Sequence, residues 1–175
     1  MESIGWKETK ENVEHEHERS KLRGRILREA VRNGHSKTTT KALAFFDAVK
    51  RGETIDLSPD TFEAIYIAGV LNGDESDYEF VLDRFLNTTF APEQIRLLHA
   101  LASTPVPYLQ QRTLELAVSD AVRPQDTISV ISSVAVLTPI GHVSVWIFLM
   151  ANWDDISSGN KFGSFGKLVG NFIDL

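Results

Sequence analysis

The 175-residue chain contains no cysteine, so disulfide bonds, thiolate metal ligands and thiol nucleophiles are all excluded. This composition is compatible with a reducing compartment, and we expect a cytoplasmic location. Basic residues are also scarce: 18 Lys and Arg face 24 Asp and Glu, which leaves a net charge of -6. Without an excess of positive charge the chain has no general attraction for phosphate backbones or anionic lipids. We therefore expect neither nucleic acid nor a membrane among its partners.

Charge is absent altogether from Thr127 to Asn152, which contains no Asp, Glu, Lys or Arg. The stretch from Val130 to Met150 is long enough to raise the question of a transmembrane helix. Pro139 and Gly141 break it into two short halves, and several Ser, Thr and His residues dilute its apolar character. The pattern therefore favours a buried helical hairpin. The first residues of the chain also lack the apolar core of a secretory signal.

No stretch alternates like a half-buried strand, so the sequence predicts an all-α fold. Apolar spacing together with start and stop signals indicates about nine helices. In the first of them, Leu22, Ile26, Leu27, Ala30 and Val31 should form one buried stripe. Ser36 and Ser58 are expected to act as N-caps, each just before its helix. Helices are expected over 13–33, 37–50, 74–87, 145–153 and 164–174, and further helices are expected to begin at 59, 92, 107 and 124.

Three prolines at expected helix starts, Pro59, Pro92 and Pro124, are 33 and 32 residues apart. That interval is typical of helical-hairpin repeats, which stack because one hairpin cannot bury its apolar face alone. We therefore expect stacked antiparallel helical hairpins, a HEAT-like segment of an α-solenoid, over residues 13–175. An irregular helical bundle is the alternative. Residues 1–12 should form an irregular N-terminal segment, and uncovered faces of the end hairpins predict weak self-association.

A search for catalytic chemistry finds no complete motif. His15 and His17 are only two residues apart, whereas a helical zinc pair needs a spacing of four so that both rings face one metal. Gly163 and Gly166 precede a lysine but fail the spacing of a phosphate-binding loop. The other histidines are scattered without the neighbours of a catalytic triad, and they are His35, His99 and His142. We expect no catalytic or metal-binding residue in this chain.

The stretch Val122-Arg123-Pro124-Gln125-Asp126-Thr127, followed by Val130-Ile131, resembles a signature of the puromycin-sensitive branch of the gluzincin zinc aminopeptidases. Further similarities follow in the family's order and span nearly the whole chain. They are Ile4-Gly5-Trp6, Leu22-Arg23-Gly24, Ser58-Pro59-Asp60, Ala100-Leu101-Ala102, Gly141, Trp146, Phe148, Asn152-Trp153 and Phe162. The sequence departs from the pattern around Leu137-Thr138-Pro139-Ile140.

In that family the similar region is the C-terminal domain, whose paired helices close over a separate zinc domain and enclose a peptide cavity. The zinc helix (HExxH) and the amine-binding loop (GxMEN) are absent from this chain. The resemblance therefore implies a non-catalytic part of a larger C-terminal domain, without a cofactor of its own. Zinc is expected in the missing catalytic domain of the same parent protein. That domain and a peptide substrate are the implied partners. A stand-alone helical-repeat scaffold that binds a protein along its concave face is the alternative function.

The resemblance also selects candidate site residues, for which we expect structural or interdomain roles rather than substrate contact. Arg123, Gln125 and Asp126 lie at a helix start, where Asp126 can accept backbone N–H bonds and Arg123 can pair with a carboxylate or carbonyl.

Trp146 and Trp153 are seven residues apart, hence on one helix face, and are expected to anchor the packing between neighbouring hairpins. Contact of an edge tryptophan with another domain is the alternative. Asn152 completes the candidate set as part of the Asn152-Trp153 match.

Overall fold

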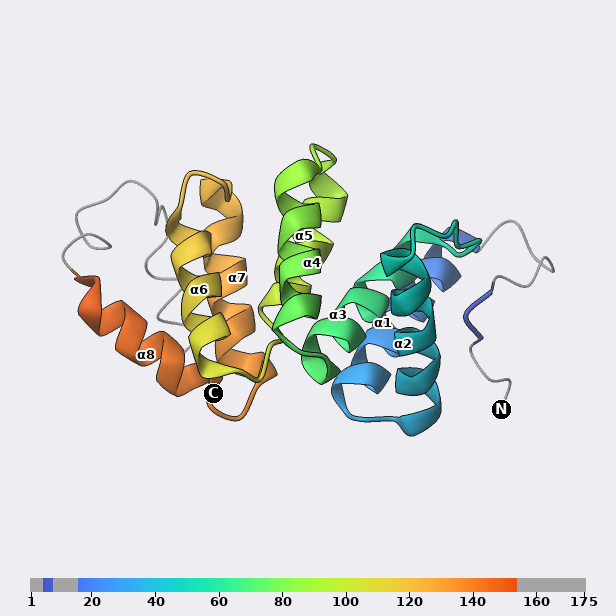
Figure 1. Cartoon of the computed structure of the whole chain (residues 1–175), viewed down its shortest axis with the longest axis horizontal. Coiled ribbons are helices and arrows are strands. Elements are labelled where there is room, and N and C mark those ends of the chain that lie inside the picture. The colour runs from blue at the N-terminus through green and yellow to red at the C-terminus, as the bar shows by residue number, and fades with distance from the viewer. Residues whose placement is uncertain (1–4, 8–15, 154–175) are drawn as a thin grey trace. The chain divides into compact units, whose positions relative to one another are not determined.

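The computed structural model describes residues 5–7 and 16–153, and over these ranges it contains helices and no strand (Figure 1). The predicted all-α class is confirmed there. The expected ninth helix, 164–174, lies outside the described residues, as do residues 13–15 of the first. The chain divides into two compact units, residues 1–81 and 82–175, whose boundary falls within one helix. The stacking of hairpins into one solenoid stays a prediction.

Several helices begin at or next to a proline. Proline is favoured in the first turn because the backbone N–H that it lacks would have no partner within the helix there. Pro107 and Pro124 are the first residues of their helices, and Pro92 is the second residue of its helix. The bounds are α1 Glu16–Arg32, α2 Ser36–Lys50, η2 Pro59–Thr61, α3 Phe62–Asn72, α4 Glu75–Asn87, α5 Ala91–Leu101, α6 Pro107–Val118, α7 Pro124–Leu137 and α8 Gly141–Ala151.

The charge-free stretch that raised the question of a membrane span is divided between α7 and α8, as the hairpin interpretation predicts. Within the part of the chain that the structure describes, every helix is too short or too polar to traverse a bilayer.

The buried face of α1 differs from the expected stripe. Leu22 and Ile26 are exposed, whereas Ser20, Gly24 and Leu27 are buried. The reason is a close backbone approach: a Cβ atom on Gly24 would overlap the carbonyl oxygen of Asp60 in η2. The helix therefore turns its small residues inward, and the Ser20 hydroxyl bonds to Ser58 at 2.7 Å and to the Asp60 carboxylate at 3.1 Å. The prediction for Leu22 and Ile26 is wrong.

Neither serine makes the predicted side-chain cap bond, although Ser58 does occupy the N-cap position of η2. Ser36 is the first residue of α2, with His35 in the N-cap position and no side-chain cap bond. Ser58 precedes the 3-10 turn η2 rather than an α-helix, and its hydroxyl contacts Ser20 of α1. The Thr61 hydroxyl and N–H both donate to the Ser58 carbonyl, which produces the tighter turn. The sequence signals thus locate the helix starts to within one residue but do not predict the contacts made there.

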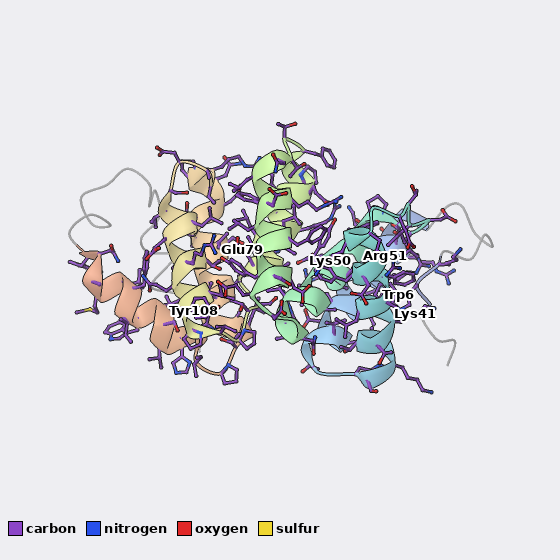
Figure 2. The ribbon with its side chains drawn as sticks, viewed as in Figure 1. Trp6, Lys41, Lys50, Arg51, Glu79 and Tyr108 are labelled. Atoms are coloured by element: carbon purple, nitrogen blue, oxygen red, sulfur yellow. The ribbon has the colours of Figure 1, made fainter. Side chains whose placement is uncertain are left out.

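Trp6 belongs to the segment expected to be irregular, yet its indole is buried against Phe45 of α2 with ring centroids 5.1 Å apart. The Lys41 ammonium lies 6.0 Å from the centre of the same Phe45 ring (Figure 2). This aromatic contact attaches Trp6 to the first unit, in which α1, α2 and α3 pack against one another.

Asp74 caps the start of α4. Its carboxylate accepts bonds from the Ser76 hydroxyl at 2.7 Å, the Ser76 N–H at 2.8 Å and the Asp77 N–H at 3.3 Å. The Ser76 hydroxyl bond, followed by the two backbone bonds, holds the pKa of Asp74 below its ordinary value of 3.8. Because the folded pKa is lowered, the stabilisation is present above the unfolded pKa and is lost as pH falls through the folded pKa.

We expect Asp74→Asn to be less stable than the wild type at pH 6, since asparagine caps the helix without the charge. This difference should disappear as pH falls through the folded pKa of Asp74, while Asp74→Ala should lack the cap at every pH. Urea unfolding between pH 6 and pH 2 measures both. An unchanged gap between the wild type and Asp74→Asn across that range would contradict the assignment.

In the second unit, α6 and α7 lie side by side and α8 packs across both (Figure 1). The side chains that fill this core are large and almost fully buried: Leu97, Leu101, Leu109, Leu114, Ile131 and Phe148. Apolar side chains spaced by three and four residues along each helix account for this packing. The candidate site residues all belong to this second unit.

Candidate functional site

Arg123, Gln125 and Asp126 lie together at the start of α7, as the sequence predicts. Arg123 occupies the N-cap position, and its Nε donates to the Asp126 carboxylate at 2.7 Å. Asp126 therefore pairs with Arg123, and α7 has no side-chain cap bond at its N-terminus. Gln125 is exposed on the first turn. The signature thus fixes one turn of helix, and Thr127 anchors that turn by donating to the carbonyl of Ala117 in α6 at 2.9 Å.

The Asp126 carboxylate also lines a shallow depression between α5 and α7, together with His99 and Ser129. The His99 Nε2 and Ser129 Oγ atoms are 3.3 Å apart, which is long for a hydrogen bond to a hydroxyl. The other lining residues are apolar: Ile95, Leu98 and Val130. The Asp126 carboxylate is held by Arg123 within α7, and the contact between His99 and Ser129 joins α5 to α7.

Across 5–7 and 16–153, no three His, Asp or Glu side chains come close enough to hold an ion. The zinc that the resemblance implies is expected on a separate domain, and no chemical step is assigned to the described residues.

Trp146 and Trp153 do not anchor the core: their side chains are 61% and 44% exposed. The expected core position is wrong because α8 buries a different face, formed by Gly141, Val145, Phe148 and Leu149. Trp146 follows Val145 by one residue and so points about 100° away from it around the helix.

The exposed side of α8 carries a stripe of apolar residues that sequence reasoning missed. We call Val143, Trp146, Ile147 and Met150 the α8 outer face; all four are exposed. A signal was available, because α8 contains no Asp, Glu, Lys or Arg and is apolar apart from His142 and Ser144. Such a helix is normally covered all round.

Asn152 has a structural position at the C-terminus of α8. Its Nδ2 donates to the Phe148 carbonyl at 2.8 Å, and its backbone N–H donates to the same oxygen at 3.1 Å. Both bonds satisfy a carbonyl that would otherwise lack a hydrogen-bond partner at the helix end.

A buried glutamine that the sequence analysis did not select ties the second unit together. Gln110 is fully buried on α6, and its Nε2 donates to the Thr104 carbonyl at 3.0 Å and to the Thr138 hydroxyl at 2.7 Å. Its Oε1 accepts from the Ser144 hydroxyl at 2.7 Å. These bonds connect α6 with the end of α7 and the start of α8, where the sequence departs from the family pattern. Both polar atoms of the Gln110 amide thus have partners.

Comparison with known proteins identifies what this arrangement is similar to. The model of the ERAP1-like C-terminal domain matches residues 1–175. Aminopeptidase M1 of Arabidopsis thaliana is 35% identical over 156 residues, which make up 87% of this chain and 17% of that protein. Aminopeptidase M1-A of Oryza sativa is 34% identical over 140 residues, 78% of this chain and 16% of that protein. Glutamyl aminopeptidase of Rattus norvegicus is 26% identical over 177 residues, 99% of this chain and 18% of that protein.

Proposed function

Because the chain belongs to the family of the ERAP1-like C-terminal domain, we propose that it is the non-catalytic helical part of a zinc-dependent aminopeptidase. In this role it helps to enclose the peptide cavity and regulates the access of peptides, while the zinc chemistry takes place on the catalytic domain. The partners are therefore that catalytic domain and a peptide substrate, and the cysteine-free composition supports a cytoplasmic location.

One observation carries this proposal: the family match covers the whole chain, whereas the chain spans only about a sixth of the relatives. All of those relatives are named aminopeptidases. A segment of this size, with no ligand cluster among its described residues, is suited to shaping a chamber rather than cleaving a bond. Helical repeats provide the extended surfaces that such a chamber needs.

The turn that contains Arg123 and Asp126, together with Asn152, supports the proposal because these residues belong to the helical scaffold. Each of their bonds stays within one helix or its cap, and the α7 start is fixed to α6 through Thr127. We assign them to holding helix ends in place, with Gln125 left exposed on the same turn for an interdomain contact.

Adding this chain to the zinc-bearing domain of its parent should change peptide hydrolysis, and the change should depend on peptide length. The measurement is the rate of N-terminal residue release from peptides of increasing length, with and without saturating chain. The chain alone should release none. An unrelated helical protein of similar net charge is the control for non-specific crowding. If adding this chain to the zinc-bearing domain changes neither the hydrolysis rates nor the preference for peptide length, the proposed cavity enclosure loses its support.

A stand-alone scaffold that binds a protein partner is the second candidate, and the exposed α8 outer face favours it. The two candidate functions predict different contents for the complete reading frame of the gene. A frame that encodes the zinc motif upstream supports the aminopeptidase, and a gene that encodes this helical segment without it supports the scaffold.

A further inference from the structure

The loop between α2 and η2 carries an exposed hydroxyl that the fold does not use. Thr54 lies within residues 53–56, which have no regular secondary structure, and its side chain is exposed. Among the described residues, none forms a hydrogen bond with Thr54. The Glu53 N–H, one residue earlier, still donates to the Ala48 carbonyl at the end of α2, at 3.0 Å. Thr54 can therefore enter the cleft of a modifying enzyme without breaking a bond of its own.

Two basic residues precede Thr54 at the end of α2. Lys50 is the last residue of the helix and Arg51 is its C-cap (Figure 2), four and three residues before the hydroxyl. In the whole sequence, Arg51 is the only arginine that is followed three residues later by serine or threonine. Basophilic serine/threonine kinases recognise this arrangement, because an acidic pocket beside their active site accepts the arginine. The position of Thr54 is therefore typical of a substrate of such a kinase.

We propose that Thr54 is a phosphorylation site for a basophilic, ATP-dependent serine/threonine kinase. In this step the Thr54 Oγ1 atom attacks the γ-phosphorus of Mg-ATP, a new O–P bond forms, and the bond to the β-phosphate oxygen breaks to release ADP. The hydroxyl proton passes to the catalytic aspartate of the kinase. The product carries about two negative charges at pH 7. The proposal is independent of the aminopeptidase role, because it depends only on this loop and on a compartment that contains ATP.

Arg51 is accessible to such a kinase although it has an ion-pair partner. Its Nε lies 2.6 Å from the Glu53 carboxylate, and the two side chains are 60% and 54% exposed. An ion pair so open to water stabilises little and exchanges readily. Lys50 is held more firmly, since its ammonium pairs with the Asp77 carboxylate and lies 5.9 Å from the centre of the Phe46 ring. Arg51 rather than Lys50 should therefore decide recognition.

Thr40 provides a comparison within the same unit. It is exposed, and a basic residue, Lys37, lies three residues before it, but both belong to α2. A kinase binds its substrate as an extended segment, in which residues three apart are well separated, whereas a helix brings them onto one face. The helix would have to unwind before Thr40 could react. We expect phosphate on Thr54 and none on Thr40.

Phosphorylation of the full chain by the catalytic subunit of cAMP-dependent protein kinase tests the site, with radioactive ATP for the rate and mass spectrometry for the position. We expect one phosphate per chain, on Thr54, and none on the Thr54→Val variant. Arg51→Ala should lower kcat/KM by at least about tenfold. The matched control is Arg25→Ala, which removes an exposed arginine of the same unit and should leave kcat/KM unchanged. Glu53→Gln should raise kcat/KM about twofold, because it releases Arg51.

Circular dichroism should show the same helix content in all of these variants. The absence of phosphate from Thr54 overturns the proposal, and a peptide of residues 48–58 shows whether the folded loop or its sequence prevents the reaction. Phosphate incorporated at Thr40 instead of Thr54 overturns it as well. Equal kcat/KM values for the wild type and Arg51→Ala contradict recognition through Arg51. None of these outcomes bears on the proposed aminopeptidase function.

Discussion

Replacing Gly141 with alanine is expected to lower the free energy of unfolding of the second unit by about 3 kcal/mol. Gly141 is the buried first residue of α8, and a Cβ atom there would overlap the carbonyl oxygen of Val134 in α7. It would also lie 2.9 Å from the hydroxyl of Thr138. A backbone oxygen inside a helix cannot rotate aside as a side chain can, so the added methyl group must push α7 and α8 apart.

Urea unfolding followed by circular dichroism, which reports on the helices of both units, measures this loss. Gly52→Ala is the matched control, because an added Cβ there meets no atom within 4 Å and only the positive φ of 75° is strained. We expect it to cost about 1 kcal/mol. If Gly141→Ala were no more destabilising than Gly52→Ala, the close approach of the two helices would be wrong.

Gly141 also illustrates what the sequence could predict. The Pro139 and Gly141 pair indicated a break between two buried helices, and the structure ends α7 at Leu137 and begins α8 at Gly141. The prolines at 107 and 124 likewise marked helix starts to the residue. These signals act locally, through the missing N–H of proline and the missing Cβ of glycine, so the sequence alone is enough to interpret them.

Contacts between helices were less predictable, because they depend on which neighbour comes close. The periodicity of α1 allowed Leu22 to be buried, but the approach of the Asp60 backbone to Gly24 rotated the helix so that small residues face inward. In α8 every face is apolar, so periodicity could not decide which face is covered, and Trp146 was assigned to the wrong one. A helix with two apolar faces needs its tertiary neighbours to resolve the choice.

In the candidate site, too, local features were predictable from the sequence and contacts between residues were not. The family signature located the start of α7, and the Arg123–Asp126 pair lies there. The bond partner of Asp126 was not predictable, since a carboxylate in the first turn can accept from the backbone or from a nearby guanidinium. Gln110 was missed because a glutamine followed by Gln111 and Arg112 resembles a surface residue until the folded chain brings Thr138 and Ser144 to it.

Replacing Gln110 with leucine should destabilise the second unit by about 3 kcal/mol, the other large effect that we expect. Leucine fills much of the same space but removes the bonds to the Thr104 carbonyl, the Thr138 hydroxyl and the Ser144 hydroxyl. Thr104 and Thr138 are themselves buried, so water cannot easily replace the lost partner. The penalty therefore comes mainly from polar groups left unsatisfied rather than from lost packing.

The neighbouring Gln111 provides the control, because it is exposed on the same helix and bonds only to Glu115, at 3.0 Å. Gln111→Leu should change the unfolding free energy by less than about 0.5 kcal/mol. A double-mutant cycle then separates network from packing. Ser144→Ala should destabilise the wild type but cost less when Gln110 is already leucine, since its hydroxyl has then lost its acceptor. Strictly additive losses would mean that the amide does not couple α6 to α8.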